Sequence, residues 1–100
     1  HRDKRGGDEV ALALEELSEC IPSNTSVEES VIAEELSERI NRFVGTLVPT
    51  ERRVFLCRYW YLDSIEKIGT DFRFSSSKVR SMLHRTREKL RVYLEKEGVL

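Results

Sequence analysis

The chain has 100 residues, of which 39% are hydrophobic and 35% are charged, and its formal net charge is −1. This length suits one small domain and is too short for two well-buried cores. No apolar run approaches the length of a signal peptide or a membrane span, so we expect no membrane segment. Since the first residue is His rather than Met, we expect a piece of a longer soluble protein.

The small net charge conceals a strong polarity along the chain. Residues 1–50 contain 5 Lys/Arg against 11 Asp/Glu, whereas residues 73–100 contain 8 Lys/Arg against 3 Asp/Glu. A basic segment of this kind provides the positive potential that a DNA-binding helix needs. We therefore expect the C-terminal end to meet DNA and the acidic half to avoid it.

The sequence contains no pattern that is typical of catalysis or metal binding. Cys20 and Cys57 lie far apart without a Cys-x-x-Cys motif or nearby His, so we expect neither a zinc site nor a disulfide. Reduced thiols fit a cytoplasmic protein. No paired carboxylates, no nucleophile with a base and no glycine-rich phosphate loop is present. We expect a protein that is not an enzyme and has no cofactor.

The first 25 residues read as a linker with one short helix. Residues 1–8 combine charges with a Gly pair and offer nothing to bury, which is typical of a linker or a frayed terminus. The apolar residues that follow predict a short helix near Leu14 to Cys20. Pro22 and the polar residues after it end this pattern.

Two helices are predicted in the middle of the chain. Ser26-Val-Glu-Glu29 has the form of a capping box, and an apolar stripe follows it to about Thr46. Pro49 stops this helix and begins the next, because Pro is tolerated at a helix start, and Glu51 suits the positive N-terminal end. The second helix is expected to reach about Tyr61 and to pack through Val54, Phe55, Arg58 and Tyr59.

The C-terminal part predicts a short amphipathic helix, a tight break and a longer basic helix. Ser64 and Ser75 are expected to cap the two helices, and Gly69 marks a close crossing. Residues at helical spacing form an apolar stripe on the longer helix: Val79, Leu83, Thr86, Leu90 and Leu94. The opposite face carries Ser77, Lys78, Ser81, His84 and Arg85.

This pattern predicts a helix-turn-helix that reads double-stranded DNA, since hydroxyls, an imidazole and long cations can contact phosphates and base edges. No segment shows convincing strand alternation. We therefore predict an all-α fold: a small four-helix domain with a C-terminal helix-turn-helix, preceded by a linker with a short helix.

Three segments together resemble region 4 of bacterial RNA polymerase sigma factors of the extracytoplasmic-function (ECF) type. They are Leu47-Val-Pro-Thr-Glu-Arg-Arg-Val-Phe-Leu-Cys-Arg-Tyr59, the later Ser-Ile-Glu-Lys-Ile-Gly, and Lys78-Val-Arg-Ser-Met-Leu-His-Arg-Thr-Arg-Glu-Lys-Leu90. The resemblance implies that residues 26–97 are region 4, with the helix-turn-helix at about 64–97. Residues 1–25 would then be the linker that follows a missing region 2.

What the resemblance implies is promoter recognition at the upstream (minus-35) element and docking on the β flap of core RNA polymerase. It makes Ser81, His84 and Arg85 candidates for base-edge contact, flanked by Lys78 and Arg80. Candidate phosphate contacts are Arg52, Arg53, Arg73 and Arg87, together with the start of the last helix at Ser76 and Ser77. Arg73 replaces the family's usual turn Gly, so the turn must be strained or differ in conformation.

Two other classes of protein stay open at this stage. The basic helix could bind an acidic protein such as an anti-sigma factor, so that the domain is a protein-interaction module. The chain could also be a helix-turn-helix repressor, although it shows no obvious dimerisation helix. Trp60 could be a partner anchor or a packing residue, because aromatic side chains serve in both roles.

Overall fold

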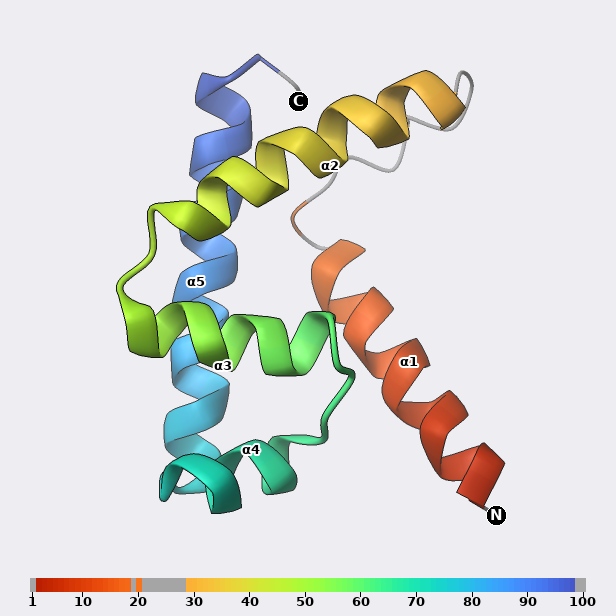
Figure 1. Cartoon of the computed structure of the whole chain (residues 1–100), viewed down its shortest axis with the longest axis vertical. Coiled ribbons are helices and arrows are strands. Elements are labelled where there is room, and N and C mark those ends of the chain that lie inside the picture. The colour runs from red at the N-terminus through yellow and green to blue at the C-terminus, as the bar shows by residue number, and fades with distance from the viewer. Residues whose placement is uncertain (1, 19, 21–28, 99–100) are drawn as a thin grey trace.

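Five α-helices make up the part of the chain that the structure describes. A computed structural model describes the backbone of residues 2–18, 20 and 29–98, and the side chains of residues 9–18, 20 and 36–98. The helices are α1 (Arg2–Ser18), α2 (Glu29–Gly45), α3 (Pro49–Tyr59), α4 (Ile65–Phe72) and α5 (Ser76–Lys96). In Figure 1, α4, α3 and α2 pack along α5 in that order from its N-terminal to its C-terminal end. The predicted all-α fold is confirmed.

The N-terminal helix is longer than the sequence predicted. We expected a linker over residues 1–8 and a helix near Leu14 to Cys20, but α1 begins at Arg2, passes through the Gly pair and ends at Ser18. Its inner face packs on α3, with the Ala13 side chain only 2% exposed. These tertiary contacts outweigh the helix penalty of about 1 kcal/mol that each glycine carries.

Helices α2 and α3 begin and end close to the predicted residues. Of the predicted capping box, residues 26–28 lie outside the described part of the chain. Pro49 occupies the first turn of α3 as expected, while the residue before it, Val48, makes no side-chain cap. Helix α3 ends at Tyr59 rather than Tyr61, and Trp60 is its C-cap. Leu62 shortly after it has a left-handed backbone with φ 59°, which no longer belongs to a right-handed helix.

The two serine caps of the helix-turn-helix are confirmed. Ser64 Oγ accepts a hydrogen bond from the Lys67 amide at 3.0 Å, and Ser75 Oγ accepts one from the Lys78 amide at 3.1 Å. Each bond satisfies an amide that has no partner within its helix. The caps therefore fix where α4 and α5 begin, and with them the length of the turn.

Arg73 keeps the left-handed conformation that the turn demands. It has φ 61° and ψ 41°, and its amide donates to the Gly69 carbonyl at the end of α4. A non-glycine residue in this region carries about 1–2 kcal/mol of strain. The sequence allowed two possibilities, a strained turn or a turn with a different backbone conformation. The structure shows the strained turn.

We expect Arg73→Gly to raise the free energy of unfolding by about 1 kcal/mol, because relief of the strain exceeds the added entropy of the unfolded chain. Thermal unfolding followed by circular dichroism measures the change. Arg91→Gly, in the exposed interior of α5, should instead destabilise by about 1 kcal/mol. A lower melting temperature for Arg73→Gly would contradict the assignment of strain.

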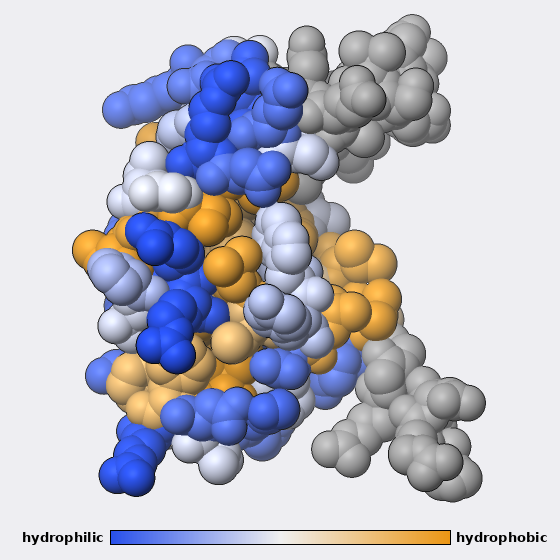
Figure 2. Space-filling model, viewed as in Figure 1, coloured by the Kyte–Doolittle hydropathy of each residue, from blue (hydrophilic) through white to orange (hydrophobic). Residues whose placement is uncertain are grey.

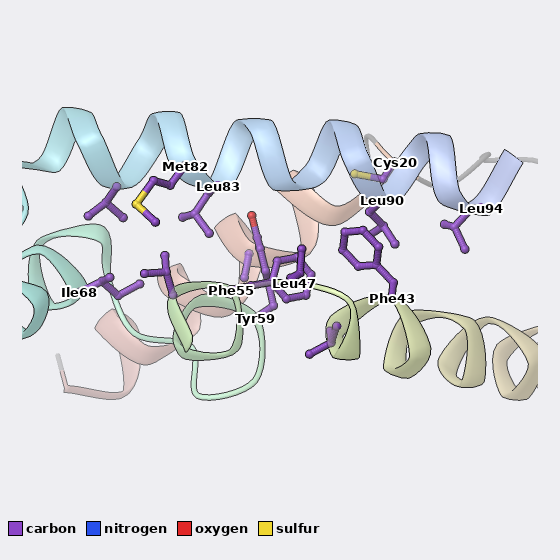
Figure 3. Packing of buried hydrophobic residues seen from close by; sticks show 14 residues of the cluster. Cys20, Phe43, Leu47, Phe55, Tyr59, Ile68, Met82, Leu83, Leu90 and Leu94 are labelled. Atoms are coloured by element: carbon purple, nitrogen blue, oxygen red, sulfur yellow. The ribbon is translucent and has the colours of Figure 1, made fainter. Parts of the chain in front are cut away.

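The hydrophobic core lies between α5 and the three helices packed along it. Figure 3 shows Leu83, Leu90 and Leu94 of α5 pointing toward side chains of the other helices, among them Phe43 and Phe55. All five residues of the predicted α5 stripe are buried: Val79, Leu83, Thr86, Leu90 and Leu94. The buried Thr86 hydroxyl donates to the Met82 carbonyl at 2.9 Å, which satisfies its polar group.

Candidate nucleic-acid interface

The N-terminal half of α5 presents an exposed polar and basic face. Because the buried stripe anchors one side of the helix, the other side is turned to solvent along two to three turns. The exposed residues are Ser77, Lys78, Arg80, Ser81, His84 and Arg85, and Ser76 beside them is half-buried. The structure therefore places the predicted base-edge contacts and the predicted phosphate contacts at the start of α5 beside one another on this helix.

Two aromatic rings hold cations on either side of the turn before α5. The Arg53 guanidinium lies 5.3 Å from the centroid of the Phe72 ring, and Lys78 Nζ lies 4.1 Å from that of Phe74. The two rings stack on each other with centroids 5.8 Å apart. Contacts of this kind orient a cation without neutralising its charge. Together with the exposed Arg73, which lies between Phe72 and Phe74 in the sequence, these cations place three positive charges in or beside the turn.

Arg52, a predicted phosphate contact, is hydrogen-bonded to backbone carbonyls of the protein. Its Nε donates to the Val44 carbonyl at 3.2 Å, and its Nη2 donates to the Leu47 carbonyl at 3.0 Å. These carbonyls belong to the end of α2 and the loop after it, where helical partners are missing. The guanidinium thus joins α3 to the end of α2 and the loop after it.

Arg87, another predicted phosphate contact, turns toward α3 and α1. Its Nη1 donates to the Tyr59 hydroxyl at 2.9 Å and lies 3.7 Å from the Glu16 carboxylate. Its side chain is only 15% exposed. In this structure Arg87 is therefore part of a largely buried ionic cluster and does not belong to the exposed face of α5.

Arg58 is a residue of this cluster whose role the sequence reading missed. Its side chain is 2% exposed, and its guanidinium donates to both oxygens of Glu16, at 3.2 and 2.9 Å. It also donates to Glu9 at 2.8 Å and to the Asp63 carbonyl at 2.9 Å. A buried Arg requires an anionic partner. Because the sequence predicted that Arg58 packs inward, it could also have indicated that such a partner exists.

The ionic cluster shifts the pKa values of its members. Burial would raise the pKa of the Glu16 carboxyl, but hydrogen bonds from Arg58 and Tyr59, with the charges of Arg58 and Arg87, hold it below its usual value. Burial would lower the pKa of Arg58, yet its bonds to Glu16 and Glu9 raise it overall. The pKa of Tyr59 is raised, first by burial. Glu16 and Arg58 are therefore charged, and Tyr59 is a neutral donor, near neutral pH.

An apolar groove occupies the other half of α5. It has a volume of about 500 Å³ and lies between the end of α2, the start of α3 and the C-terminal half of α5. Val48 and Val92 on its edges are 57% and 46% exposed. The ion pair between Lys89 and Glu51, at 3.2 Å, joins α5 to α3 beside it. Exposed apolar surface of this kind is typical of a contact with another protein.

Other exposed hydrophobic side chains lie on α1 and after α3. Apolar surface is visible on the upper part of α1 in Figure 2, and Leu12 and Leu14 of this helix are 46% and 62% exposed. Trp60 is 51% exposed, whereas Tyr59 is buried as predicted. Trp60 therefore does not belong to the core.

The described residues contain no group of His, Cys, Asp and Glu side chains that could hold a metal ion. Cys20 and Cys57 form no disulfide, and the Cys20 thiol donates to the Arg87 carbonyl at 3.4 Å. Within the same part of the chain, no helix has both the length and the apolar character needed to cross a membrane.

The tight two-helix unit and the exposed basic face of its second helix define a helix-turn-helix DNA-binding domain. The model of the family Sigma-70, region 4, matches residues 44–92, from the end of α2 to the C-terminal half of α5. Through these residues the chain belongs to the sigma-70 region 4 family, the DNA-binding helix-turn-helix domain of sigma factors. No curated protein and no solved structure matched the chain.

Proposed function

We propose that this chain is the promoter-reading domain of an ECF-type sigma factor. The N-terminal half of α5 would enter the major groove of the upstream (minus-35) element, where Ser81, His84 and Arg85 reach base edges. The observation that supports this role is the exposed basic face of α5 within a sigma region 4 domain. The role is binding rather than catalysis, in the cytoplasm and without a cofactor.

The phosphate contacts in this proposal come from the turn before α5. Arg53 lies over the Phe72 ring and Lys78 over the Phe74 ring, and Arg73 in the turn itself is exposed. Phosphate contacts fix the register of the helix in the groove, while base contacts provide specificity. The amides at the start of α5 add a positive end that favours a phosphate.

We further propose that the apolar groove receives the β flap of core RNA polymerase. The groove uses the C-terminal half of α5, so an occupant there would leave the N-terminal half open to DNA. Burial of the exposed Val48 and Val92 side chains would favour binding of an apolar partner segment. Helix α5 would then contact DNA with its N-terminal half and polymerase with its C-terminal half.

Arg85→Ala tests the DNA-reading role. We expect it to weaken binding by about 1–3 kcal/mol, roughly 5- to 150-fold, because it removes a bidentate base contact. The melting temperature should stay unchanged, since Arg85 is exposed. Fluorescence anisotropy with promoter duplex gives the affinity, and nuclease protection by core polymerase carrying the intact sigma protein tests the promoter contact.

Arg91→Ala is the matched control for this experiment. Arg91 is exposed on the same helix, carries the same charge and pairs with Glu88 at 2.7 Å, but lies beyond the proposed reading face. It should change DNA affinity by less than about 1 kcal/mol. Equal losses for Arg85→Ala and Arg91→Ala would show that α5 attracts DNA only through its total charge.

The apolar groove also favours a second candidate function, in which an anti-sigma factor is the main partner of the free chain. An anti-sigma factor that covered the groove would compete with polymerase for the same apolar edge. Val92→Asp should then reduce anti-sigma and polymerase binding together, because a charge would be buried without a partner. If Val92→Asp lost polymerase binding but kept anti-sigma binding, the anti-sigma factor would bind outside the apolar groove.

A further inference from the structure

The Glu16 carboxylate sits in a ready-made anion site. Arg58 donates to both of its oxygens, at 3.2 and 2.9 Å, and the Tyr59 hydroxyl donates at 2.8 Å. Arg87 lies 3.7 Å away and donates to the same Tyr59 hydroxyl. Two guanidinium groups and one hydroxyl from α3 and α5 thus surround one carboxylate from α1. Every donor comes from the domain, and the anion comes from the N-terminal helix.

The site can accept a phosphate as well as a carboxylate. Arg forms bidentate hydrogen bonds to both groups with the same planar fork, and Tyr59 is a neutral hydroxyl donor. Arg58 is 2% exposed, so loss of Glu16 without a replacement anion would leave a buried cation underpaired. The group that replaces Glu16 must therefore carry negative charge and accept several hydrogen bonds.

The location of this site connects it with the DNA-reading surface. A cavity of about 130 Å³ beside it is lined by Glu16, Ile65, Arg80, Leu83 and Arg87. Ile65 is the first residue of α4, whose N-terminal end carries a partial positive charge. Arg80 is exposed on α5 next to the reading face. The cavity thus borders both helices of the helix-turn-helix, α4 and α5, as well as α1.

We propose that Arg58, Tyr59 and Arg87 form a binding site for a phosphate of the DNA backbone, and that Glu16 occupies this site in the free chain. The inference rests on the proposed function, since it concerns DNA bound by the same helix-turn-helix. Docking of α1 and binding of DNA then compete for one site. By linkage, whatever releases α1 strengthens DNA binding, and DNA weakens the docking of α1 by the same factor.

Glu16→Gln in the full chain tests the competition, with Glu15→Gln as its matched control. Both variants remove one negative charge from α1, but Glu15 is exposed and its side chain is outside the cluster. We expect Glu16→Gln to bind duplex DNA several-fold more tightly than Glu15→Gln. Its log–log salt dependence should be steeper by about one, as for one added phosphate contact. Equal affinities and equal salt slopes in the two variants would overturn the proposal.

Two further variants distinguish an effect of the anion site on DNA binding from an effect of total charge and from damage to the fold. Ala13→Gln crowds the buried α1 contact while it leaves every charge in place, so it should also strengthen DNA binding. Adding Arg87→Met to Glu16→Gln should abolish the gain. A gain that persists without Arg87, or an Ala13→Gln variant that releases α1 in hydrogen exchange without tighter DNA binding, would refute the competition.

Inorganic phosphate distinguishes failure of this proposal from failure of the DNA-reading role. Phosphate should raise the melting temperature of Glu16→Gln more than that of Glu15→Gln, because the vacated site takes the anion. Phosphate stabilisation without tighter DNA binding would overturn DNA as the ligand. If Arg85→Ala weakens DNA binding while Glu16→Gln responds to neither DNA nor phosphate, the anion site is wrong and the reading role stands. If no variant binds duplex DNA, both proposals fail.

Discussion

Phe55→Ala is expected to lower the free energy of unfolding by about 3–5 kcal/mol, the largest effect of any change considered for this chain. Phe55 is completely buried, and its ring packs edge-on against Tyr59 and Phe43, with centroids 4.8 and 6.2 Å away. Since Phe43 belongs to α2, the ring joins α3 to α2 beneath α5. Truncation would leave a cavity where three helices meet.

Urea unfolding followed by circular dichroism measures this loss. Domains of this size have a total stability of about 5–15 kcal/mol, so the variant could lose a third of it or more. Tyr61→Ala is the matched control, because it removes an aromatic ring that is 73% exposed just after the same helix. It should change stability by less than about 0.5 kcal/mol. Similar losses for both variants would contradict Phe55 as the centre of the core.

The part of the fold that local rules determine could be predicted from the sequence. The α5 stripe could be identified because five residues at helical spacing have one face to bury, and all five are buried. Ser64 and Ser75 could be identified as caps because a serine before an apolar helical pattern satisfies amides that the helix leaves unpaired. The exposed phase of Ser81 and Arg85 follows from the same helical period.

The extent of α1 could not be predicted because it depends on contacts that are distant in sequence. Its Gly pair predicts poor helix formation, and nothing near residues 1–8 indicates otherwise. What favours the docked helix is the fit of Ala13 against the domain and the pairing of Glu9 and Glu16 with Arg58, more than 40 residues along the chain. Such a pairing can be predicted from the sequence only if the inward position of Arg58 is considered together with the acidic character of the N-terminal half.

The partners that Arg52 and Arg87 have in the free chain could not be predicted from a family pattern. Both residues were predicted to contact phosphate because they match positions in a basic motif, and in the free chain each guanidinium is bound to groups of the protein. Arg52 reaches the carbonyls of Val44 and Leu47, and Arg87 flanks the buried stripe close enough to reach Tyr59. Long side chains at the edge of a buried face can turn either way, and the available partners determine which.

Gly69→Val is expected to cost about 3 kcal/mol of stability, because the added side chain meets backbone that cannot move away freely. A Cβ atom at Gly69 would lie 2.7 Å from the carbonyl oxygen of Phe74, within the turn between α4 and α5. The close neighbour is thus the backbone of the turn, where the sequence predicted a crossing helix.

Relief of this clash would move the turn and with it the start of α5. Any Gly69→Val chain that stays folded should therefore bind DNA more weakly, since Arg73 and Lys78 move relative to α4. Gly45→Val is the matched control: Gly45 ends α2, nothing lies within 4 Å of its added Cβ, and stability should change by less than about 0.5 kcal/mol. Unfolding in urea and duplex anisotropy on both variants measure the two effects. If Gly69→Val unfolds like Gly45→Val, the turn yields without cost and its close approach to α4 does not set the geometry of the reading helix.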